Sequence, residues 1–145
     1  MRGIMKIPIP SLPSLKELLV ILVPDTGLNN EYGNPVEYSI ASNEAVIGID
    51  VIFDGVSMGE VQTLELTIVF DDGTQRSQEY TCTSDQLTCK YTLTPYDILL
   101  YISPETYTHV NIFQKKIAKI MARAKTSLSM AYGVSSVALR ILRVT

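Results

Sequence analysis

The sequence has no tryptophan, a single histidine and only two cysteines among its 145 residues. Charged residues are also scarce, at 19%, whereas hydrophobic residues make up 46%. This balance excludes an intrinsically disordered chain, because disorder requires low hydrophobicity and high net charge. The formal net charge of −3 provides no overall positive field that would attract nucleic acid. We therefore expect one globular domain with one core, and we do not expect nucleic acid as its main partner.

Long hydrophobic stretches are missing from the N-terminal region. The apolar run from Leu18 to Val23 is six residues long and is flanked by Glu17 and Pro24. A membrane-spanning helix needs about 20 apolar residues, and a signal peptide needs roughly 7–15 of them before a cleavage site with small residues. The sequence therefore predicts neither a signal peptide nor a transmembrane segment.

Motifs for catalysis or cofactor binding are also missing. The sequence contains no glycine-rich nucleotide-binding pattern, and the single histidine, His109, has no cysteine or serine motif near it. Asp50 and Asp54 do not have the spacing of an EF-hand loop, and Asp54-Gly55 is a typical turn pair. We therefore expect no enzymatic activity, no cofactor, no metal and no small-molecule substrate.

Strand signals dominate what is present. Alternating apolar residues in "AVIGIDVIF" place Ala45, Ile47, Ile49, Val51 and Phe53 on one face, and "TLELTIVF" repeats the pattern. The pair Asp72-Gly73 then predicts a hairpin with a two-residue type I′ turn. The return strand, 75–83, is polar, which is typical of a sheet edge or of the wall of an interface. "SSVALRILRV" predicts a final strand.

Two segments fit both helix and strand. Ser14 and Glu17 match a capping box before a short helix at 15–23, but the β-branched run there also fits a buried strand. At about 114–131, an apolar stripe at helical spacing competes with a strand in which Ile120, Ala122 and Ala124 alternate with charged residues. Both interpretations stay open for each segment.

Both cysteines lie in "TCTSDQLTC". A hairpin folded about Asp85-Gln86 would place Cys82 opposite Cys89, and facing Cα atoms about 4.5–5.5 Å apart suit a disulfide, which needs roughly 4.4–6.8 Å. Two reduced thiols are the main alternative. A metal or redox pair fits less well, because zinc needs four ligands and redox pairs are usually Cys-x-x-Cys. A disulfide would indicate a setting outside the cytosol or a hyperthermophile.

Proline at positions 8, 10 and 13 makes "MKIPIPSLP" an extended arm, because proline cannot donate a hydrogen bond within a central strand. The chain thus divides into an arm, 1–13, and a single β-sandwich domain, 14–145. We predict that the arm packs on a neighbouring subunit through its apolar residues, which are Ile4, Met5, Ile7, Ile9 and Leu12.

One basic cluster lies near the C-terminus, with Lys115, Lys119, Arg123 and Lys125 as its main members. A solvated face is the simplest interpretation. Contact with an acidic neighbouring subunit, acidic lipid headgroups or nucleic acid is the alternative. The cluster is therefore a candidate charged contact face.

The stretch "IAKIMARAKTSLSMAYGVSSVALRILRV" resembles the closing strands of small β-sandwich proteins from hyperthermophilic archaea and their viruses. The resemblance rests on "AKTSLS" followed by an alternating strand, and it covers less than a quarter of the chain. Such virus proteins build capsids and appendages from jelly-roll subunits, and the resemblance implies the same role here. No functional residue carries over.

Counting both ambiguous segments as strands gives about eight or nine strands, enough for an antiparallel two-sheet sandwich of jelly-roll type. We therefore expect a mainly β fold with an N-terminal arm, and with a helix at about 114–131 only if that segment is not a strand. The predicted function is a structural subunit of a virion, in its capsid or an appendage, with copies of itself and other subunits as partners. The alternative is a non-catalytic module that binds a sugar or a protein within a cytoplasmic complex.

Overall fold

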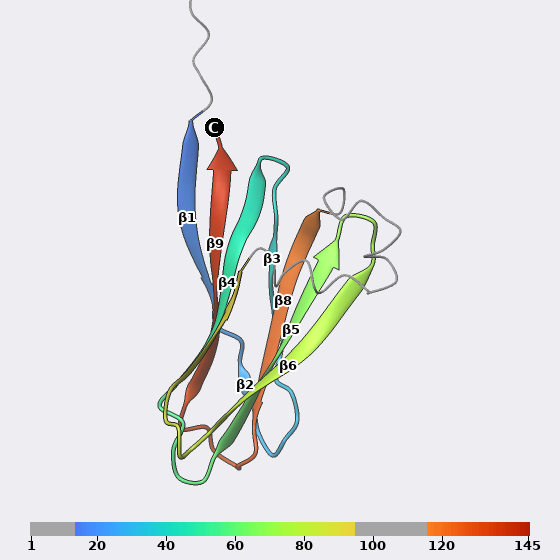
Figure 1. The fold of residues 1–145 in the computed structure, drawn as a ribbon. Helices are drawn as coiled ribbons and strands as arrows, with labels where there is room; N and C mark the ends of the chain where they lie inside the picture. Colours follow the sequence, from blue (N-terminus) through green and yellow to red (C-terminus); the bar gives the residue numbers. More distant parts are fainter. Residues whose placement is uncertain (1–13, 95–115) are drawn as a thin grey trace, which may run out of the picture.

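The structure is a computed structural model that describes residues 14–94 and 116–145, and within these ranges it contains nine strands and no helix (Figure 1). The strands are β1 (Leu15–Leu22), β2 (Thr26–Gly27), β3 (Val36–Ser39), β4 (Glu44–Asp54), β5 (Val61–Phe70), β6 (Gln75–Thr83), β7 (Cys89–Leu93), β8 (Ile117–Thr126) and β9 (Val134–Val144).

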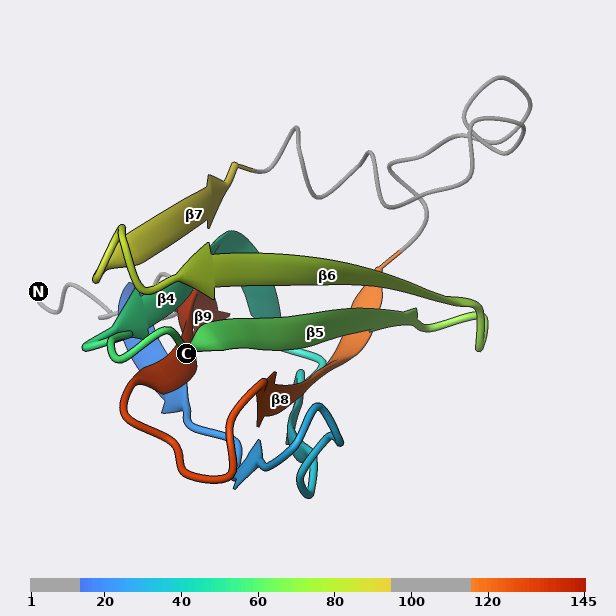
Figure 2. The ribbon, with the colours of Figure 1, turned by 90° about the horizontal axis from the view of Figure 1, so that it is seen from below.

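The strands form two sheets that face each other across the core (Figures 1 and 2). The first sheet has the order β1-β9-β4-β7, and all of its neighbours are antiparallel. The second has the order β2-β8-β5-β6, with β3 also paired to β8. Only the short β2 runs parallel to its neighbour. The prediction of a mainly β, two-sheet sandwich is confirmed for the described residues.

Strand pairing is nested around the β5–β6 hairpin. Outside this hairpin, β4 pairs with β7, β3 pairs with β8, and β1 pairs with β9. The described chain therefore resembles one long hairpin whose two halves are distributed over two sheets. As a result, the first and last described strands are neighbours, and the Thr145 amide donates to the Ser14 carbonyl oxygen at 3.0 Å.

The core lies between the two sheets and is built by residues at period two. Ile49, Val51 and Phe53 on β4 are fully buried, as the alternation predicts. The predicted face does not extend back to Ala45 and Ile47, because a register shift between Val46 and Gly48 interrupts the alternation. Fully buried side chains from β5, β8 and β9 complete the core, namely Leu64, Leu66, Ile68, Ile120, Val137, Leu139 and Ile141.

Both ambiguous segments are strands. In β8, buried Ile120, Ala122 and Ala124 alternate with outward-facing neighbours, so the helix interpretation of 114–131 is wrong for 117–126. Pairing explains this outcome, because β8 has β5 on one side and β2 and β3 on the other. The segment 15–22 is also a strand rather than a helix, but it lies at a sheet edge with one face exposed.

The hairpin between β5 and β6 is confirmed, but its predicted turn type is wrong. Val69 pairs with Gln75, and the Phe70 amide donates to the Thr74 carbonyl, so three residues form the loop. Only Gly73 has positive φ there, at 86°. This is the three-residue hairpin with glycine in the left-handed region, which does not need positive φ at Asp72.

Candidate functional site

A disulfide joins the two sheets. Cys82, on β6, and Cys89, on β7, are bonded, with their Cα atoms 5.9 Å apart. The predicted disulfide is therefore confirmed, but the hairpin argument for it is wrong. Cys82 pairs with Gln62 in the second sheet, whereas Cys89 pairs with Phe53 in the first. Residues 84–88 carry the chain from one sheet to the other, and the disulfide closes the sandwich at that edge.

Tyrosine contacts reinforce the same edge. The Tyr91 hydroxyl on β7 donates to the Thr81 carbonyl oxygen on β6 at 2.7 Å. The Tyr91 ring also lies 5.3 Å from that of Tyr80 and meets the Phe53 ring edge-on at 6.3 Å. Aromatic pairs of this kind add about 0.5–1.5 kcal/mol beyond their buried area. The β6–β7 side of the sandwich is thus closed by covalent, polar and aromatic contacts.

A buried carboxylate holds the β8–β9 loop. Glu60 is fully buried and accepts hydrogen bonds from the Thr126 hydroxyl and from the Tyr132 and Gly133 amides, at 2.7, 3.0 and 2.9 Å. Gln62 adds a fourth donor at 3.2 Å. Burial raises the pKa of Glu60, but the four hydrogen bonds lower it by more, so the carboxylate is ionised at neutral pH.

Gln62 extends this polar network across the core. It is fully buried, and its amide nitrogen donates to the Gly133 carbonyl at 2.6 Å, while its oxygen accepts from the Ser135 hydroxyl. Every polar group of this cluster is therefore paired within the chain. A fully paired buried network specifies one arrangement of the loop, so its role is structural.

A second carboxylate ties the two sheets together at the opposite end. Glu44 on β4 is buried and accepts from the Ala41 amide at 2.9 Å and from Arg143 on β9 at 2.7 Å. The Tyr38 hydroxyl, on β3 of the other sheet, donates to the same carboxylate at 3.1 Å. The Ala41 amide and the Arg143 guanidinium hold the pKa of Glu44 below its usual value.

The predicted charged contact face lies on the outer face of the second sheet, where much of it is paired within the chain. Arg123 forms two hydrogen bonds to Glu65, at 2.8 and 3.2 Å, and its guanidinium lies 4.1 Å from the centre of the Tyr32 ring. Lys119 is 3.4 Å from Glu37. Lys125 lies 4.6 Å over the same tyrosine ring. Contact with another subunit stays a prediction, and Lys115 lies outside the described residues.

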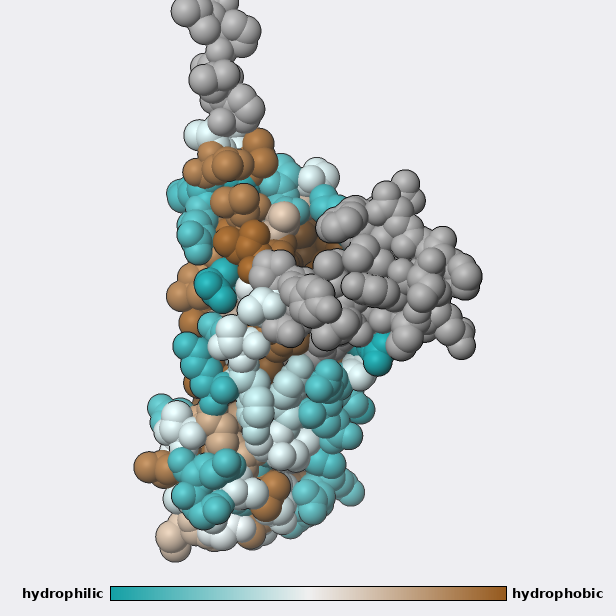
Figure 3. Space-filling view, in the orientation of Figure 1, coloured by the Kyte–Doolittle hydropathy of each residue, from teal (hydrophilic) through white to brown (hydrophobic). Residues whose placement is uncertain are grey.

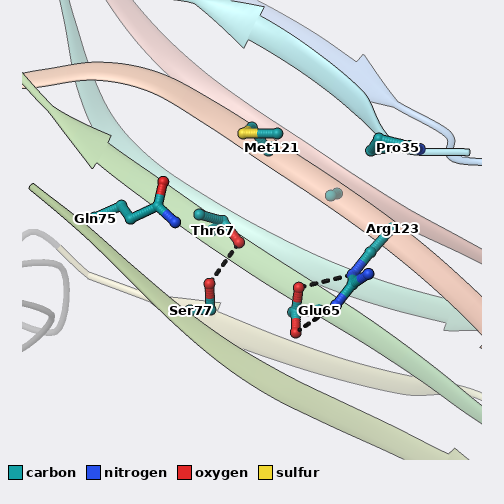
Figure 4. Close-up of a pocket in the computed structure, with 8 residues that line it drawn as sticks. Pro35, Glu65, Thr67, Gln75, Ser77, Met121 and Arg123 are labelled. Carbon is teal, nitrogen blue, oxygen red and sulfur yellow. Dashed lines mark hydrogen bonds and ion pairs between the residues drawn. The ribbon is translucent and has the colours of Figure 1, made fainter. Parts of the chain in front are cut away.

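The same face contains a hollow of about 250 Å³. Figure 4 shows its charged and hydroxyl groups paired with each other, since Arg123 contacts Glu65 and the Thr67 and Ser77 hydroxyls lie 2.7 Å apart, whereas the Gln75 amide is drawn without such a contact. Met121 and Pro35 supply its apolar part. A ligand bound here would have to compete with these internal hydrogen bonds.

The edge strand β1 exposes a row of large apolar side chains. Leu15, Leu19, Ile21 and Val23 are 65%, 64%, 54% and 53% exposed, and hydrophobic surface follows β1 at the upper left of Figure 3. Their neighbours in the strand, Leu18, Val20 and Leu22, pack against the core instead. From Leu18 to Leu22 the strand is therefore apolar on both faces, and only one of these faces is covered, whereas Glu17 lies between Leu15 and Leu19 on the exposed face. Contiguous apolar surface of this kind marks interaction sites.

A second apolar group lies at the loop end of the sandwich. Met58, Leu87 and Met130 are exposed on the β4–β5, β6–β7 and β8–β9 loops. These loops are packed together, because the Val56 amide donates to the Leu87 carbonyl and Glu60 binds the β8–β9 loop. Met58 and Leu87 also have φ of 60° and 58°, a conformation that is uncommon for residues other than glycine.

Several predicted features lie outside the described residues, and they stay predictions. These are His109 and the arm residues Ile4, Met5, Ile7, Ile9 and Leu12. Within 14–94 and 116–145, no group of three or more histidine, cysteine or acidic residues is placed to hold a metal ion. No helix in these ranges is long and apolar enough to cross a membrane.

No protein-family model matches the chain, and no curated protein has significant sequence similarity to it. Among solved structures, its fold is similar to chains in the structure of the infectious bursal disease virus Gx strain, with a TM-score of 0.38 and 12% identity over 92% of this chain. A VP2 subviral particle of the same virus matches with a TM-score of 0.34 and 15% identity over 90% of this chain. The chain spans about a third of the length of both proteins, 33% and 32%.

Likeness at this level shows neither a family nor a function. The archaeal and hyperthermophile origin that the sequence resemblance implied also stays a prediction. The functional argument therefore rests on which residues are exposed, buried and paired.

Proposed function

We propose that the chain is a non-catalytic structural subunit that associates with copies of itself, in the capsid or an appendage of a virion. The observation that carries this proposal is the exposed apolar face of β1, which stands at the open edge of the first sheet. Burying one Leu or Ile side chain contributes about 1.5–3 kcal/mol. Leu15, Leu19, Ile21 and Val23 are between 53% and 65% exposed, so covering each of them contributes about half of that value or slightly more, which supports a subunit contact.

We further propose that the sandwich is a jelly roll. The nested pairing of β5 with β6, β4 with β7, β3 with β8 and β1 with β9 supports this assignment. A jelly roll distributes eight strands over two sheets in two Greek keys. In this assignment β2 and β3 together form one of the eight strands, since both pair with the same side of β8.

Two buried polar atoms on the outer face of the first sheet are unpaired among the described residues. Asp50 Oδ1 and Arg140 Nε are shielded from solvent and have no hydrogen-bond partner among the described residues. Arg140 lies beside Leu19 in the β1–β9 pair and crosses over Gly48. Buried polar atoms are normally paired, but both atoms are already shielded within the single chain, so they do not point to a neighbouring subunit.

Sedimentation velocity of the purified chain over a wide concentration range tests the proposal. The wild-type chain should form oligomers, and a Leu19→Lys, Ile21→Lys variant should be a folded monomer, because it places two charges on the apolar face of β1. Met58→Lys is the matched control, since it changes an equally exposed apolar residue at the loop end. A wild-type chain that stays monomeric at every concentration would contradict the proposed self-association. The virion role further requires that the chain is detected in purified virus particles.

The second candidate is a module that binds a sugar or a protein, and the hollow between Pro35, Met121 and Arg123 favours it. This candidate ranks lower, because the charged and hydroxyl groups of the hollow are already paired. Glycan-array binding that is lost in an Arg123→Ala variant but kept in Leu19→Lys would favour it over the structural role.

A further inference from the structure

We propose that residues 6–12 of a neighbouring copy bind as an added strand along the open edge of β1. This inference rests on the proposed self-association and identifies the segment that contacts β1. The inference combines two features. The edge of β1 is open, and the arm segment can form the hydrogen bonds of a β-sheet on only one of its two sides.

The receiving edge is β1 itself. It pairs with β9 along its whole length, from Leu15↔Val144 to Leu22↔Val137, and no described strand pairs with its other side. Alternate backbone N–H and C=O groups therefore point away from the sheet, as they do at any sheet edge. Peptides commonly bind such edges by adding a strand.

The part of β1 that follows Lys16 and Glu17 also lacks the features that protect other edges. From Leu18 to Leu22 it contains no charge and no proline. The edge strand β6 is the contrasting case, because it contains Arg76, Glu79 and a series of polar residues, and most of its side chains are exposed. Charged and polar residues discourage pairing between edges. Of the edges at β1 and β6, only the one at β1 is suited to receive a further strand.

The arm has the complementary backbone pattern. Successive N–H groups in a strand point to opposite sides, so those of Ile7, Ile9 and Ser11 share one side, whereas Pro8 and Pro10 occupy the other. A strand formed by this segment can pair only through its Ile7 and Ile9 side. Its proline side would then face away from the sheet and prevent the addition of another strand. Proline is tolerated on this outer side of an edge strand.

The side chains of the arm match the face of β1. Ile7 and Ile9 are two residues apart and would lie on the same face of the added strand. Placed beside β1, they would continue the apolar row of Leu15, Leu19 and Ile21, because facing side chains on neighbouring strands are about 4.5–5.5 Å apart. The contact would cover the flank of these side chains that faces the open edge, because an added strand lies in the plane of the sheet.

The turn chemistry favours the arm of a neighbour over the chain's own arm. A tight hairpin from Ser11 back to β1 would place Leu12 and Pro13 in its loop. Two-residue hairpin loops need positive φ at their first position, which leucine rarely adopts, and residues 4–14 contain no glycine or asparagine. The arm therefore cannot fold back onto its own β1 through a tight turn.

Competition by synthetic peptides tests this inference on the full chain. A peptide of residues 4–13 should inhibit oligomer formation in light scattering and sedimentation. N-methylation of Ile9, which removes a ladder-side N–H, should weaken inhibition by about tenfold or more. N-methylation of Leu12, whose N–H lies on the opposite side, is the matched control and should have little effect.

The outcomes separate the inference from the proposed function. If the full chain forms oligomers but no peptide competes, or if both N-methylated peptides compete equally, strand addition is wrong and self-association stands. If the chain never forms oligomers, the proposed function itself fails.

A cross-linking experiment identifies the donor of the arm. In an Ile9→Cys, Leu19→Cys variant prepared from mixed heavy and light isotope cultures, the proposal expects disulfides between position 9 of one copy and position 19 of another, joining heavy and light chains. Disulfides only within one copy would overturn exchange between copies. Bonds that join position 19 of two copies would show β1 pairing with β1, which would also overturn the inference.

Discussion

Glu60 shows how one residue secures a loop that joins the two sheets. Its carboxylate accepts four hydrogen bonds, of which two come from backbone amides of the β8–β9 loop. Its partners are up to 73 residues away in the sequence. The loop conformation therefore depends on a contact that no local sequence pattern indicates.

A Glu60→Gln variant should be less stable by at least about 2 kcal/mol, because an amide presents an NH₂ group to donors that need an acceptor, and a buried unpaired donor costs roughly 1–3 kcal/mol. Urea unfolding followed by circular dichroism measures the change. Glu65→Gln is the control, since its pair with Arg123 is partly exposed and should contribute no more than about 1 kcal/mol. Equal losses in both variants would contradict the assigned role.

Acid should destabilise the fold through Glu44 and Glu60. Hydrogen bonds keep the pKa of both groups below the usual value of 4.5. Their contribution to stability is therefore complete above about pH 4.5, and it is lost as the pH falls through the lower pKa of the folded state. Urea unfolding at pH 7 and at steps down to pH 3 should show this loss, and a Glu44→Gln variant should show a smaller pH dependence. A pH-independent unfolding free energy in the wild type would refute the assignment.

At the scale of elements, the two edge strands of the first sheet, β1 and β7, differ. At one edge, β7 is bonded to β6 of the other sheet by the disulfide and the Tyr91 hydrogen bond. At the other edge, β1 pairs with β9 alone among the described strands and exposes its outer face. One edge of this sheet is therefore joined to the facing sheet, and the other exposes apolar side chains.

Replacing both cysteines by serine should lower the unfolding free energy by about 2–2.5 kcal/mol, which is the chain-entropy value for a loop of this length. Urea unfolding under non-oxidising conditions measures this change in unfolding free energy, and alkylation with mass spectrometry should find no free thiol in the unreduced wild type.

Hydrogen exchange in the variant without cysteines should accelerate first in β6 and β7, because the disulfide joins these two strands. Faster exchange in β1 and β9 instead would contradict the view that this bond closes the β6–β7 edge.

At the scale of the whole molecule, the ion pairs of the second sheet lie on a different face from the apolar row of β1, although Glu17 and Arg140 share the face of that row. The outer face of the second sheet pairs Arg123 with Glu65 and Lys119 with Glu37, whereas the first sheet exposes the apolar row of β1. A subunit contact through β1 would therefore depend on apolar burial more than on ion pairs.

We accordingly expect oligomers to persist from low salt to 1 M salt, where the screening length falls to about 3 Å. Sedimentation across this range provides the measurement. A Lys115→Ala, Lys119→Ala, Arg123→Ala variant should form oligomers nearly as well as the wild type, whereas Leu19→Lys, Ile21→Lys should not. Dissociation at moderate salt would show that charged contacts dominate.

The sequence alone determined which segments of β4, β5 and β9 are strands, because period-two alternation is a local property of the chain. It also indicated their core-facing residues, except Ala45 and Ile47, where a register shift interrupts the alternation. It further indicated the bond between Cys82 and Cys89, although the hairpin from which that bond was predicted does not form. The polar return strand β6 was predicted as a sheet edge or as the wall of an interface, and it lies at the edge of the second sheet.

Only the tertiary structure decided how these strands are divided between sheets. Segment 117–126 fits a helix and a strand equally well in isolation, and its pairing with strands on both sides selected the strand. The same division placed the two cysteines in different sheets, so their bond crosses the sandwich instead of a hairpin. The buried acceptors Glu44 and Glu60 have partners up to 99 and 73 residues away. Contacts over such separations exist only once the sheets pack, which is why local patterns did not indicate them.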